Sequence, residues 1–366
     1  MRHRLQEKVH PNAFCFWSFL PYLDWCLLLW QQFLSINFMG DIKICVIGAG
    51  RWGKNHIRTL FELGALGGVV DPDAQQRNKI KELFPQAACF DSLENAFQTN
   101  FDGYVVATPP VTHIDLTKDI LKKKTPVLVE KPLTLSVEAG MKIQSLIKNL
   151  DGKLIVGHLL LFHPAIIKMK EMIEDGIIGD LQYIYSNRLN LGVVRKEENV
   201  FWSFAPHDIS LFQFFTGSFP VEVQSSGGAF IQKNIHDTTI TYLKYPDGAQ
   251  GHIYVSWLHP FKEHRLVIIG SKGSLHFEDS TENKPLLFYE KDSDPDLNLL
   301  SLKNKPSRKI EYEQTLPLTN ELKYFIDVVR GKKIDKATFD EGLDVVKILE
   351  MATNSLTNKT LPISPS

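Results

Sequence analysis

Short apolar runs and helical periodicities alternate along the first half of the chain. The apolar runs at 42–47, 67–70, 103–107, 126–129 and 153–156 are typical of buried strands. Helical spacing between them spans 54–63, 74–83, 113–123 and 136–149, and we expect His56 and Arg58 to point outward from the first of these helices. Strands and helices joined by short connections predict an α/β fold with a doubly wound parallel sheet.

After Gly157 the pattern changes to a period of two. Alternating runs at 181–189, 238–245, 249–257, 265–269 and 274–277 predict strands, and 164–175, 206–216, 318–329 and 339–356 predict helices. The turns 246–248 and 271–273 separate alternating runs and predict hairpins. This half is therefore expected to be an α+β domain with a large, mostly antiparallel, open-faced sheet, its last helices packing back on both domains.

A chain of 366 residues exceeds one ordinary core, so we expect two domains, at 39–156 and 157–366. The segment 1–38 differs from both, because apolar residues dominate 14–38 after three basic residues, as in a signal peptide or membrane anchor. However, proline and aspartate interrupt it, and its longest apolar stretch is far short of the roughly 20 residues that cross a bilayer. We favour Met39 as the physiological start, with 1–38 disordered or mis-assigned, and expect a cytoplasmic protein without a stable membrane span.

The charge balance and the cysteine pattern exclude several classes of partner. The formal net charge is -1, and the basic run at 122–124 is expected to be a solvated helix end, so nucleic acid is not an expected partner. The four cysteines form no CxxC pair and the twelve histidines no HExxH motif. We therefore expect neither a disulfide framework nor a metal site.

A glycine motif joins the first predicted strand to the first helix. Gly48, Gly50 and Gly53 fit GxGxxG, in which the first glycine permits a tight turn, the second admits a pyrophosphate and the third allows close packing of helix and strand. The free N–H groups of the helix N-terminus attract the anion. Arg51 and Trp52 lie within the motif and are expected to contact the same dinucleotide. The pattern predicts a Rossmann domain.

Asp71 ends the second predicted strand, about 20 residues after the glycine motif, where a carboxylate binds the ribose hydroxyls of NAD. The same carboxylate would repel the 2′-phosphate of NADP. Pro72 follows it, and no arginine stands beside it in the sequence. The predicted cofactor is therefore NAD.

Two further loops follow strands at the same edge of the sheet. The sequence ATPPVTH contributes Thr108, Pro109 and His113, and its prolines stiffen a surface on which a flat cofactor can lie. The next strand ends in Glu130 and Lys131, followed by proline. A lysine at the carboxyl end of a buried strand points into a cleft, so we expect all five residues to line the cofactor site.

GAGRWG, ATPPVTH and EKP, in this order before an α+β domain, resemble the Gfo/Idh/MocA family of oxidoreductases over about residues 40 to 360. The resemblance implies an NAD-dependent dehydrogenase acting on CH–OH, in which Lys131 contacts both substrate and nicotinamide. The family's aspartate and the histidine four residues later fall on Ser203 and His207, so this chain departs from the pattern at the aspartate. Lys131 and His207 are the catalytic pair that we predict.

The reaction implied is oxidation of a secondary ring hydroxyl, with hydride transfer to the nicotinamide and removal of the hydroxyl proton by a base. The pKa of free lysine is near 10.4, so burial must lower the pKa of Lys131 before it acts as that base. His207 is expected to titrate near neutrality without such a shift. Either residue can be the base, and a third interpretation makes His207 the cap of a helix that begins at Pro206.

Segments 157–164, 186–192 and 201–208 are similar to those of family members that act on the 3-hydroxyl of UDP-N-acetylglucosamine or its uronate in surface-polysaccharide or amino-sugar biosynthesis. The resemblance gives as substrate residues His163, Arg188, Asn190, Trp202, His207 and Asp208. Arg188 would hold a diphosphate or carboxylate, Asn190 a hydroxyl group, and Trp202 a sugar or uracil face. In the alternative, which is equally weighted, Arg188 pairs with an acid on the sheet and Trp202 fills the core.

Two other functions remain open. One is a dehydrogenase of free sugars or cyclitols, and the other is a non-catalytic NAD(H)-binding sensor, against which the presence of Lys131 and His207 argues. The resemblance further implies a homo-oligomer, a dimer or tetramer, formed through the outer face of the second sheet. The apolar alternation at Ile253, Val255 and Trp257 fits either that face or contact with the domain's own helices.

Overall fold

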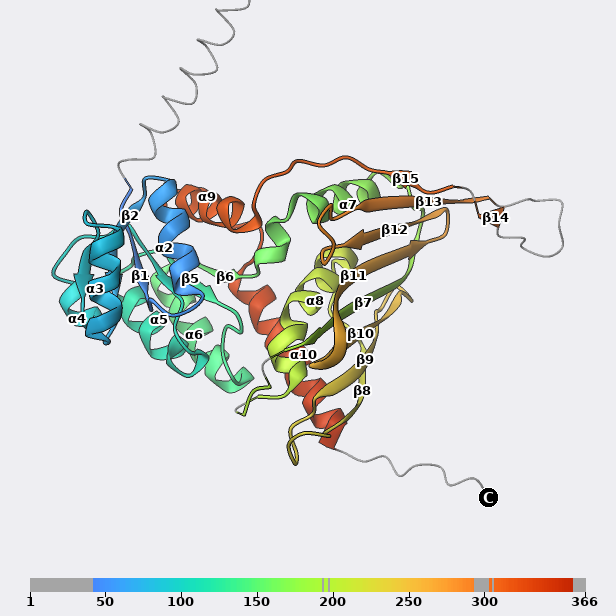
Figure 1. The fold of residues 1–366 in the computed structure, drawn as a ribbon, viewed down its shortest axis with the longest axis horizontal. Helices are drawn as coiled ribbons and strands as arrows, with labels where there is room; N and C mark the ends of the chain where they lie inside the picture. The colour runs from blue at the N-terminus through green and yellow to red at the C-terminus, as the bar shows by residue number, and fades with distance from the viewer. Residues whose placement is uncertain (1–41, 193, 197, 293–302, 305, 358–366) are drawn as a thin grey trace, which may run out of the picture.

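The computed structural model of this chain describes residues 42–192, 194–196, 198–292, 303–304 and 306–357. Two α/β units lie side by side, one around a parallel sheet and the other around a larger, mostly antiparallel sheet (Figure 1). The predictions for segment 1–38 fall outside the described residues. Within the described part of the chain, none of the helices is long and apolar enough to cross a membrane.

The first sheet has six parallel strands in the order β3-β2-β1-β4-β5-β6, as predicted for a doubly wound Rossmann domain. The strands are β1 (Ile44–Ile47), β2 (Leu66–Val70), β3 (Ala88–Phe90), β4 (Gly103–Val106), β5 (Val127–Glu130) and β6 (Leu154–Gly157). The strand order reverses between β1 and β4, which places the ligand crevice at their carboxyl ends. β3 was not predicted, because its three half-buried residues form too short a run to be recognised as a strand.

The helices of this domain are α2 (Gly53–Glu62), α3 (Ala74–Leu83), the short α4 (Leu93–Ala96), α5 (His113–Lys122) after the 3-10 turn η1 (Pro110–Thr112), and α6 (Val137–Leu150). All of them begin close to the predicted positions except α4, which was not predicted. Side-chain caps explain two of these starts, since Asp73 accepts from Gln75 N (2.8 Å) and Ser136 from Ala139 N (3.2 Å). The predicted outward orientation of His56 is wrong. Its ring is fully buried, because it hydrogen-bonds a buried carboxylate described below.

The second sheet has nine strands in the order β14-β13-β12-β11-β7-β10-β9-β8, with β15 beside β13. They are β7 (Leu181–Leu191), β8 (Glu222–Gly228), β9 (Thr238–Lys244), β10 (Gln250–Ser256), β11 (Leu258–Gly270), β12 (Gly273–Glu278), β13 (Leu286–Asp292), β14 (Lys303–Asn304) and β15 (Arg308–Lys309). Among the described strands of this sheet, only β7 and β10 pair in parallel. Both predicted hairpins, β9–β10 and β11–β12, are confirmed. β8 and β13 were missed.

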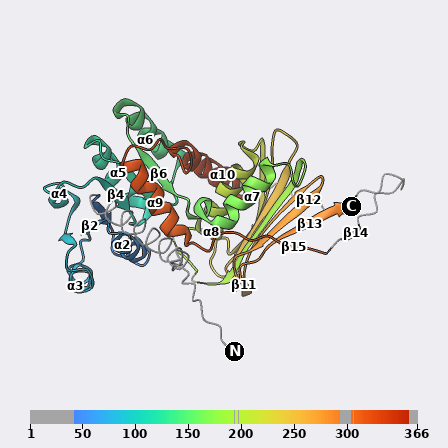
Figure 2. The same cartoon turned by 90° about the horizontal axis from the view of Figure 1, so that it is seen from above.

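Helices cover one face of this sheet (Figures 1 and 2). They are α7 (Pro164–Glu174), which follows the 3-10 turn η2 (Leu159–Phe162), α8 (Val200–Thr216) and α10 (Phe339–Thr357), whereas α9 (Pro317–Val329) returns to pack on α2. The predicted start of α8 at Pro206 is wrong. The Asn199 side chain caps the helix by accepting from Trp202 N (3.1 Å), so Pro206 and His207 both lie inside it.

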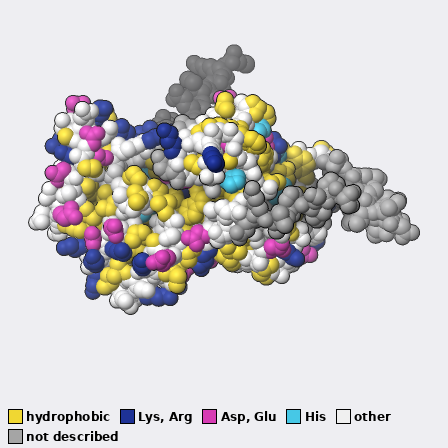
Figure 3. All heavy atoms as spheres, turned by 90° about the horizontal axis from the view of Figure 1, so that it is seen from below, with side chains coloured by type: hydrophobic (Ala, Val, Ile, Leu, Met, Phe, Trp, Pro, Cys, Tyr) yellow, Lys and Arg dark blue, Asp and Glu magenta, His cyan; other side chains and the backbone are white. Residues whose placement is uncertain are grey.

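The two faces of the second sheet differ in their side chains. Ile253, Val255 and Trp257 are almost completely buried and face the helices, so the interpretation that places them on an outer oligomer face is wrong. The outer face instead carries aromatic and imidazole rings, such as Tyr185 stacked on His252 with an interplanar angle of 3°. On the side of the molecule shown in Figure 3, Lys and Arg side chains are interspersed with Asp and Glu.

Candidate active site

The glycine motif has a backbone that only glycine tolerates at two positions. Gly48 has φ +97°, and a Cβ built there would lie 2.8 Å from the carbonyl oxygen of Ala107. A Cβ on Gly53 would lie 1.9 Å from the Gly48 carbonyl oxygen. Gly50, by contrast, faces open space, with nothing within 4 Å of such a Cβ. This geometry fits a dinucleotide, because the space over Gly50 and the N-terminus of α2 suits a pyrophosphate.

Asp71 is tied to the same motif at the end of β2. Its carboxylate accepts from Ala49 N (2.7 Å) and from Asp73 N (2.9 Å), which fixes it beside the glycine turn. A carboxylate has further lone pairs for ribose hydroxyls. No arginine is adjacent to Asp71 in the sequence, but one lies nearby in the structure: Arg77 donates to the carbonyl oxygens of Asp71 and Pro72, at 2.8 Å each.

A buried cluster joins the glycine motif to the EKP loop. The Glu130 carboxylate accepts from the indole N–H of Trp52 and lies 2.7 Å from Nε2 of the buried His56. Burial alone would raise the pKa of Glu130, but the hydrogen bond from His56, the charge of His56 and the bond from Trp52 outweigh it and lower that pKa. Trp52 and Glu130 thus belong to the scaffold that holds Lys131.

Lys131 reaches from the Rossmann domain to the second domain. Its ammonium nitrogen donates to the carbonyl oxygen of Ser203 on α8 at 3.1 Å. Burial lowers the pKa of Lys131, with Glu130 opposing the shift. This is the direction that a lysine base requires near neutral pH.

His207 lies one helical turn after Ser203, so both residues occupy one face of α8. Burial holds the pKa of His207 well below its usual range, and the charges of Lys131 and Arg188 lower it further. The expectation that His207 titrates near neutrality is therefore wrong. A neutral imidazole is available at this place, and its Nδ1 has no hydrogen-bond partner among the described residues.

The ATPP loop is fixed to the EKP loop by His113. Its two ring nitrogens lie 3.0 Å from the Pro132 carbonyl oxygen and 2.9 Å from that of Thr108. Burial lowers the pKa of His113, and a neutral ring donates to one of these carbonyls at a time. Pro109 and Thr108 form the surface of this loop, whereas His113 lies beneath it, almost completely buried.

The predicted substrate residues divide into two groups. Arg188 and Asp208 form a bidentate ion pair with distances of 2.7 and 3.1 Å, and both side chains are largely buried. Arg188 is therefore paired with an acid, although the acid comes from α8 and not from the sheet. Asn190 lies half-buried near the end of β7, two residues after Arg188 in the sequence.

The other two residues have structural contacts. The indole N–H of Trp202 donates to Thr353 Oγ1 on α10 at 2.9 Å, and the ring packs against the cores of both domains. His163 caps α7 by accepting from Ala165 N at 3.1 Å, and its ring packs against Phe277. For Trp202 the structure supports the core interpretation.

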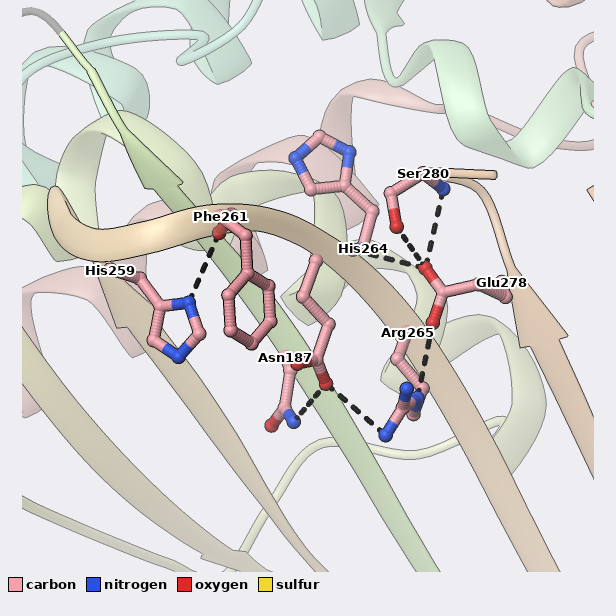
Figure 4. Close-up of polar contacts among 8 residues, drawn as sticks. Asn187, His259, Phe261, His264, Arg265, Glu278 and Ser280 are labelled. Atoms are coloured by element: carbon pink, nitrogen blue, oxygen red, sulfur yellow. Dashed lines mark hydrogen bonds and ion pairs between the residues drawn. The ribbon is translucent and has the colours of Figure 1, made fainter. Parts of the chain in front are cut away.

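Two histidines near the pair Lys131 and His207 were not among the predicted site residues. His158 directly follows β6 and is buried, so its position at a strand end was the available signal. His264 lies on β11 and points to the opposite side from Arg265 (Figure 4). On the outer face, Arg265 pairs with Glu278 and Glu263, and the amide of Asn187 donates to Glu263. Alternation along β11 could have located His264, had the strand been predicted to begin before residue 265.

No group of three or more His, Cys, Asp and Glu residues in the described ranges is arranged to hold a metal ion. The site is instead a dinucleotide cradle, closed on one side by a lysine that touches the helix of the second domain. These features define an NAD-binding oxidoreductase with a Rossmann domain.

The chain belongs to the Gfo/Idh/MocA family. The model of the oxidoreductase family, NAD-binding Rossmann fold, matches residues 42–158, and the GFO/IDH/MocA C-terminal domain matches residues 166–276. The resemblance, the fold and the NAD cofactor expected from the sequence are thereby confirmed.

Characterised relatives and solved structures are similar at low identity. The scyllo-inositol 2-dehydrogenase (NAD(+)) of Bacillus subtilis (strain 168) is 24% identical over 335 residues, 87% of this chain and 95% of that protein. UDP-N-acetylglucosamine 3-dehydrogenase from Acidithiobacillus ferrooxidans has a TM-score of 0.75 at 19% identity, covering 86% of this chain and 97% of that one. The WlbA dehydrogenase from Bordetella pertussis, solved with NADH and UDP-GlcNAcA, has a TM-score of 0.70 at 21% identity, covering 87% and 97%.

Proposed function

We propose that the protein oxidises a secondary ring hydroxyl of a sugar-type substrate, with Lys131 and His207 sharing that hydroxyl. The observation that carries this proposal is the contact between Lys131 Nζ and the Ser203 carbonyl (3.1 Å). It joins the cofactor edge of the Rossmann domain to the face of α8 that presents His207. In this proposal, the domain of residues 39–156 holds NAD, and the domain of residues 157–366 supplies the substrate site and the oligomer contacts.

Lys131 is the base in this proposal, and His207 is the hydrogen-bonding partner of the hydroxyl. Burial lowers the pKa of both residues. The shift brings the pKa of Lys131 closer to the working pH and takes the pKa of His207 further below it. A base works best when its pKa is near the working pH. When bound, NAD supplies the hydride acceptor, while Lys131 removes the hydroxyl proton.

The groups that would hold NAD come from three strand ends. Gly48, Gly50 and Gly53, with Arg51 beside them, would surround the pyrophosphate, and Asp71 would bind the ribose. Thr108 and Pro109 would support the nicotinamide half, next to Lys131. In this arrangement Trp52, His113 and Glu130 act mainly by holding these loops in place.

For the substrate itself we propose a sugar nucleotide, oxidised at its 3-hydroxyl. The fold likeness to a UDP-N-acetylglucosamine 3-dehydrogenase and to a dehydrogenase solved with UDP-GlcNAcA supports this assignment. In this proposal Asn190, Asp208 and Arg188 would lie on the substrate side and contact sugar hydroxyls.

A free cyclitol such as inositol is the second candidate. Arg188, the residue expected to hold an anion, is already neutralised by Asp208, which favours an uncharged substrate. Several relatives of similar identity are inositol dehydrogenases.

A direct assay separates the candidates. Purified protein is mixed with NAD and, in turn, UDP-N-acetylglucosamine, its uronate and myo-inositol, and NADH is followed by its absorbance. Turnover of a UDP-sugar supports the first candidate and turnover of myo-inositol the second. Tight NAD binding without turnover of any of them would contradict both and favour a sensor.

We further propose that the protein works in the cytoplasm, where NAD is available, as a homo-oligomer. Its contact would be the outer face of the second sheet, which carries Tyr183, Tyr185 and His252 and has no described helix over it. Sedimentation of the purified chain tests the oligomer, and a monomer at micromolar concentration would contradict it.

A further inference from the structure

A cavity lined by both polar and apolar side chains lies behind the proposed catalytic pair, away from the glycine motif. It measures about 210 Å³ and is enclosed by η2, the C-terminal half of α8 and the first turns of α10. Its buried lining includes His158 and Ser210. Toward the surface the lining consists of the exposed Gly217 and the partly exposed carboxylates of Glu341 and Asp344, so the cavity opens to solvent at that end.

Several polar atoms of the lining are buried without a hydrogen-bond partner in the described part of the protein. They are both ring nitrogens of His158, the side-chain oxygen of Gln213 and the hydroxyl of Ser218. Buried polar groups are rarely left unpaired, because the loss of their hydration is costly. Ordered water is the simplest partner, and a volume of this size holds about seven molecules.

The same cavity adjoins the proposed catalytic pair through two elements. In the sheet, Glu130 pairs in register with Gly157, so Lys131 and His158 follow neighbouring positions at the ends of β5 and β6. A Cβ at residue 157 would lie 3.1 Å from the Glu130 carboxyl carbon, which shows how closely the two strand ends approach.

Along α8, Ser203, His207 and Ser210 are spaced by four and three residues and therefore lie on one face of the helix. The first of them contacts Lys131 and the last lines the cavity. One helical face thus runs from the contact with Lys131 to the cavity wall.

We propose that His158 and the water of this cavity form the route by which the proton released in each oxidation leaves the site. The proposal rests on the proposed function of Lys131. The substrate O–H bond breaks as its proton passes to the neutral amine of Lys131, and the C–H electron pair leaves as hydride to the nicotinamide. The proton then passes from the Lys131 ammonium to one ring nitrogen of His158, while the other ring nitrogen gives its proton to a cavity water.

The surroundings of His158 suit this role. Burial lowers its pKa to about 4, Glu130 opposes and Lys131 adds to the shift, so the ring is neutral and does not retain the proton. Neither ring nitrogen has a hydrogen-bond partner among the described residues, so the imidazole can rotate about its side-chain bonds and regain its starting tautomer. At the mouth the cavity is lined by the carboxylates of Glu341, which accepts from Thr338 N at 2.8 Å, and of Asp344, which is paired with Lys347 at 2.7 Å.

A first experiment needs no substrate. In protein with NAD bound and 15N-labelled histidine, the ring N–H of His158 should exchange with water rapidly, although only 1% of the residue is exposed. Gln213→Leu removes a polar wall group without touching His158 and should slow this exchange at least about tenfold. Slow exchange in the wild type, or a crystal structure whose cavity is dry or filled by a tightly held small molecule, would overturn the proposal whatever the substrate is.

A second experiment uses turnover with whichever of the three probe substrates is oxidised. In weak buffer, His158→Ala should lower turnover at least about tenfold, less than loss of the base itself, with unchanged affinity for NAD. In the His158→Ala variant, proton release, followed with a pH indicator, should lag behind NADH formation. Added imidazole should restore both the turnover and the rate of proton release. The same substitution on the outer sheet face, His276→Ala, is the control and should change neither.

The outcomes separate the two proposals. Turnover of none of the probes would count against the proposed function, while the exchange experiment would still decide for or against the water route. Normal turnover and proton release in His158→Ala would contradict the route and leave Lys131 as base. A loss of turnover that imidazole does not restore would likewise contradict it and assign His158 a structural role.

Discussion

The two walls of the active site are built in different ways. The cofactor wall presents backbone: the glycine turn, the ATPP loop and the EKP loop each span a few residues at the end of one strand. The substrate wall presents side chains that already contact one another, such as Arg188 with Asp208, contributed by elements 20 residues apart in the chain. In the proposed function, the first wall would bind NAD without breaking internal hydrogen bonds, whereas the second would exchange internal hydrogen bonds for substrate contacts. Substitutions should accordingly impair binding or chemistry at the cofactor wall and stability at the substrate wall.

The largest effect is expected at the junction of the two walls. Lys131→Met removes the proposed base while keeping a long side chain, so turnover should fall by about 10²–10⁴-fold. NAD affinity should change little, because the dinucleotide is held mainly by the glycine motif and Asp71. Steady-state kinetics and NAD titration test both statements, with the exposed Lys148→Met as the control. Near-normal turnover of a verified substrate would transfer the role of base to another residue.

The same difference explains what the sequence could predict. Most strands and helices of the Rossmann domain followed from periodicity, and Gly48, Asp71 and Lys131 from their positions at strand ends, because parallel strands bring such positions together. The short β3 gave no such pattern.

Other positions, in both domains, depend on packing over long distances. In the Rossmann domain, the buried ring of His56 was predicted to point outward, since its partner Glu130 lies 74 residues later. Likewise Pro206 suggested a helix start, but the Asn199 cap and the packing of α8 keep it inside the helix. A Pro in a helix interior is unfavourable locally, and tertiary contacts must outweigh that local cost.

The second prediction concerns stability at the substrate wall. Arg188→Met leaves the carboxylate of Asp208 buried without its partner, which should cost about 3–5 kcal/mol of unfolding free energy. The double variant Arg188→Met, Asp208→Leu should be more stable than the single one, because no charge remains buried. Denaturant unfolding measures these differences. The exposed pair Lys122–Asp119 is the control, and its loss should cost less than about 1 kcal/mol. Equal losses at both pairs would contradict the contrast between buried and surface charges.

The third prediction concerns cofactor choice. Asp71→Ser removes the carboxylate that would repel a 2′-phosphate, and Arg77 already lies beside it. A hydrogen bond to a charged group is worth about 1.5–3 kcal/mol, so the affinity ratio of NADP to NAD should rise roughly 10- to 100-fold. Fluorescence titration with both cofactors measures the ratio. Adding Arg77→Gln should abolish the gain, and a gain that survives this second change would assign the phosphate contact to another residue, with Arg51 the first to test.

The last prediction concerns the effect, per pH unit, of a buried carboxyl group outside both walls, on α9. Glu321 on α9 is fully buried, and neither of its carboxyl oxygens has a hydrogen-bond partner among the described residues. Burial, with a contribution from Glu130, raises its pKa well above the usual value. In the unfolded chain the same group ionises near pH 4.3, so above that pH the folded state binds more protons than the unfolded state. Stability should therefore fall as the pH rises from about 4.3 through the raised pKa, by at most about 1.4 kcal/mol per pH unit.

Glu321→Gln, which is neutral and of similar shape, should remove this part of the pH dependence of unfolding, whereas the exposed Glu313→Gln should not. Parallel stability profiles of Glu321→Gln and the wild type between pH 5 and 8 would show that Glu321 is ionised in the folded protein, and its carboxylate would then need a water or cation partner within the α2–α9 interface.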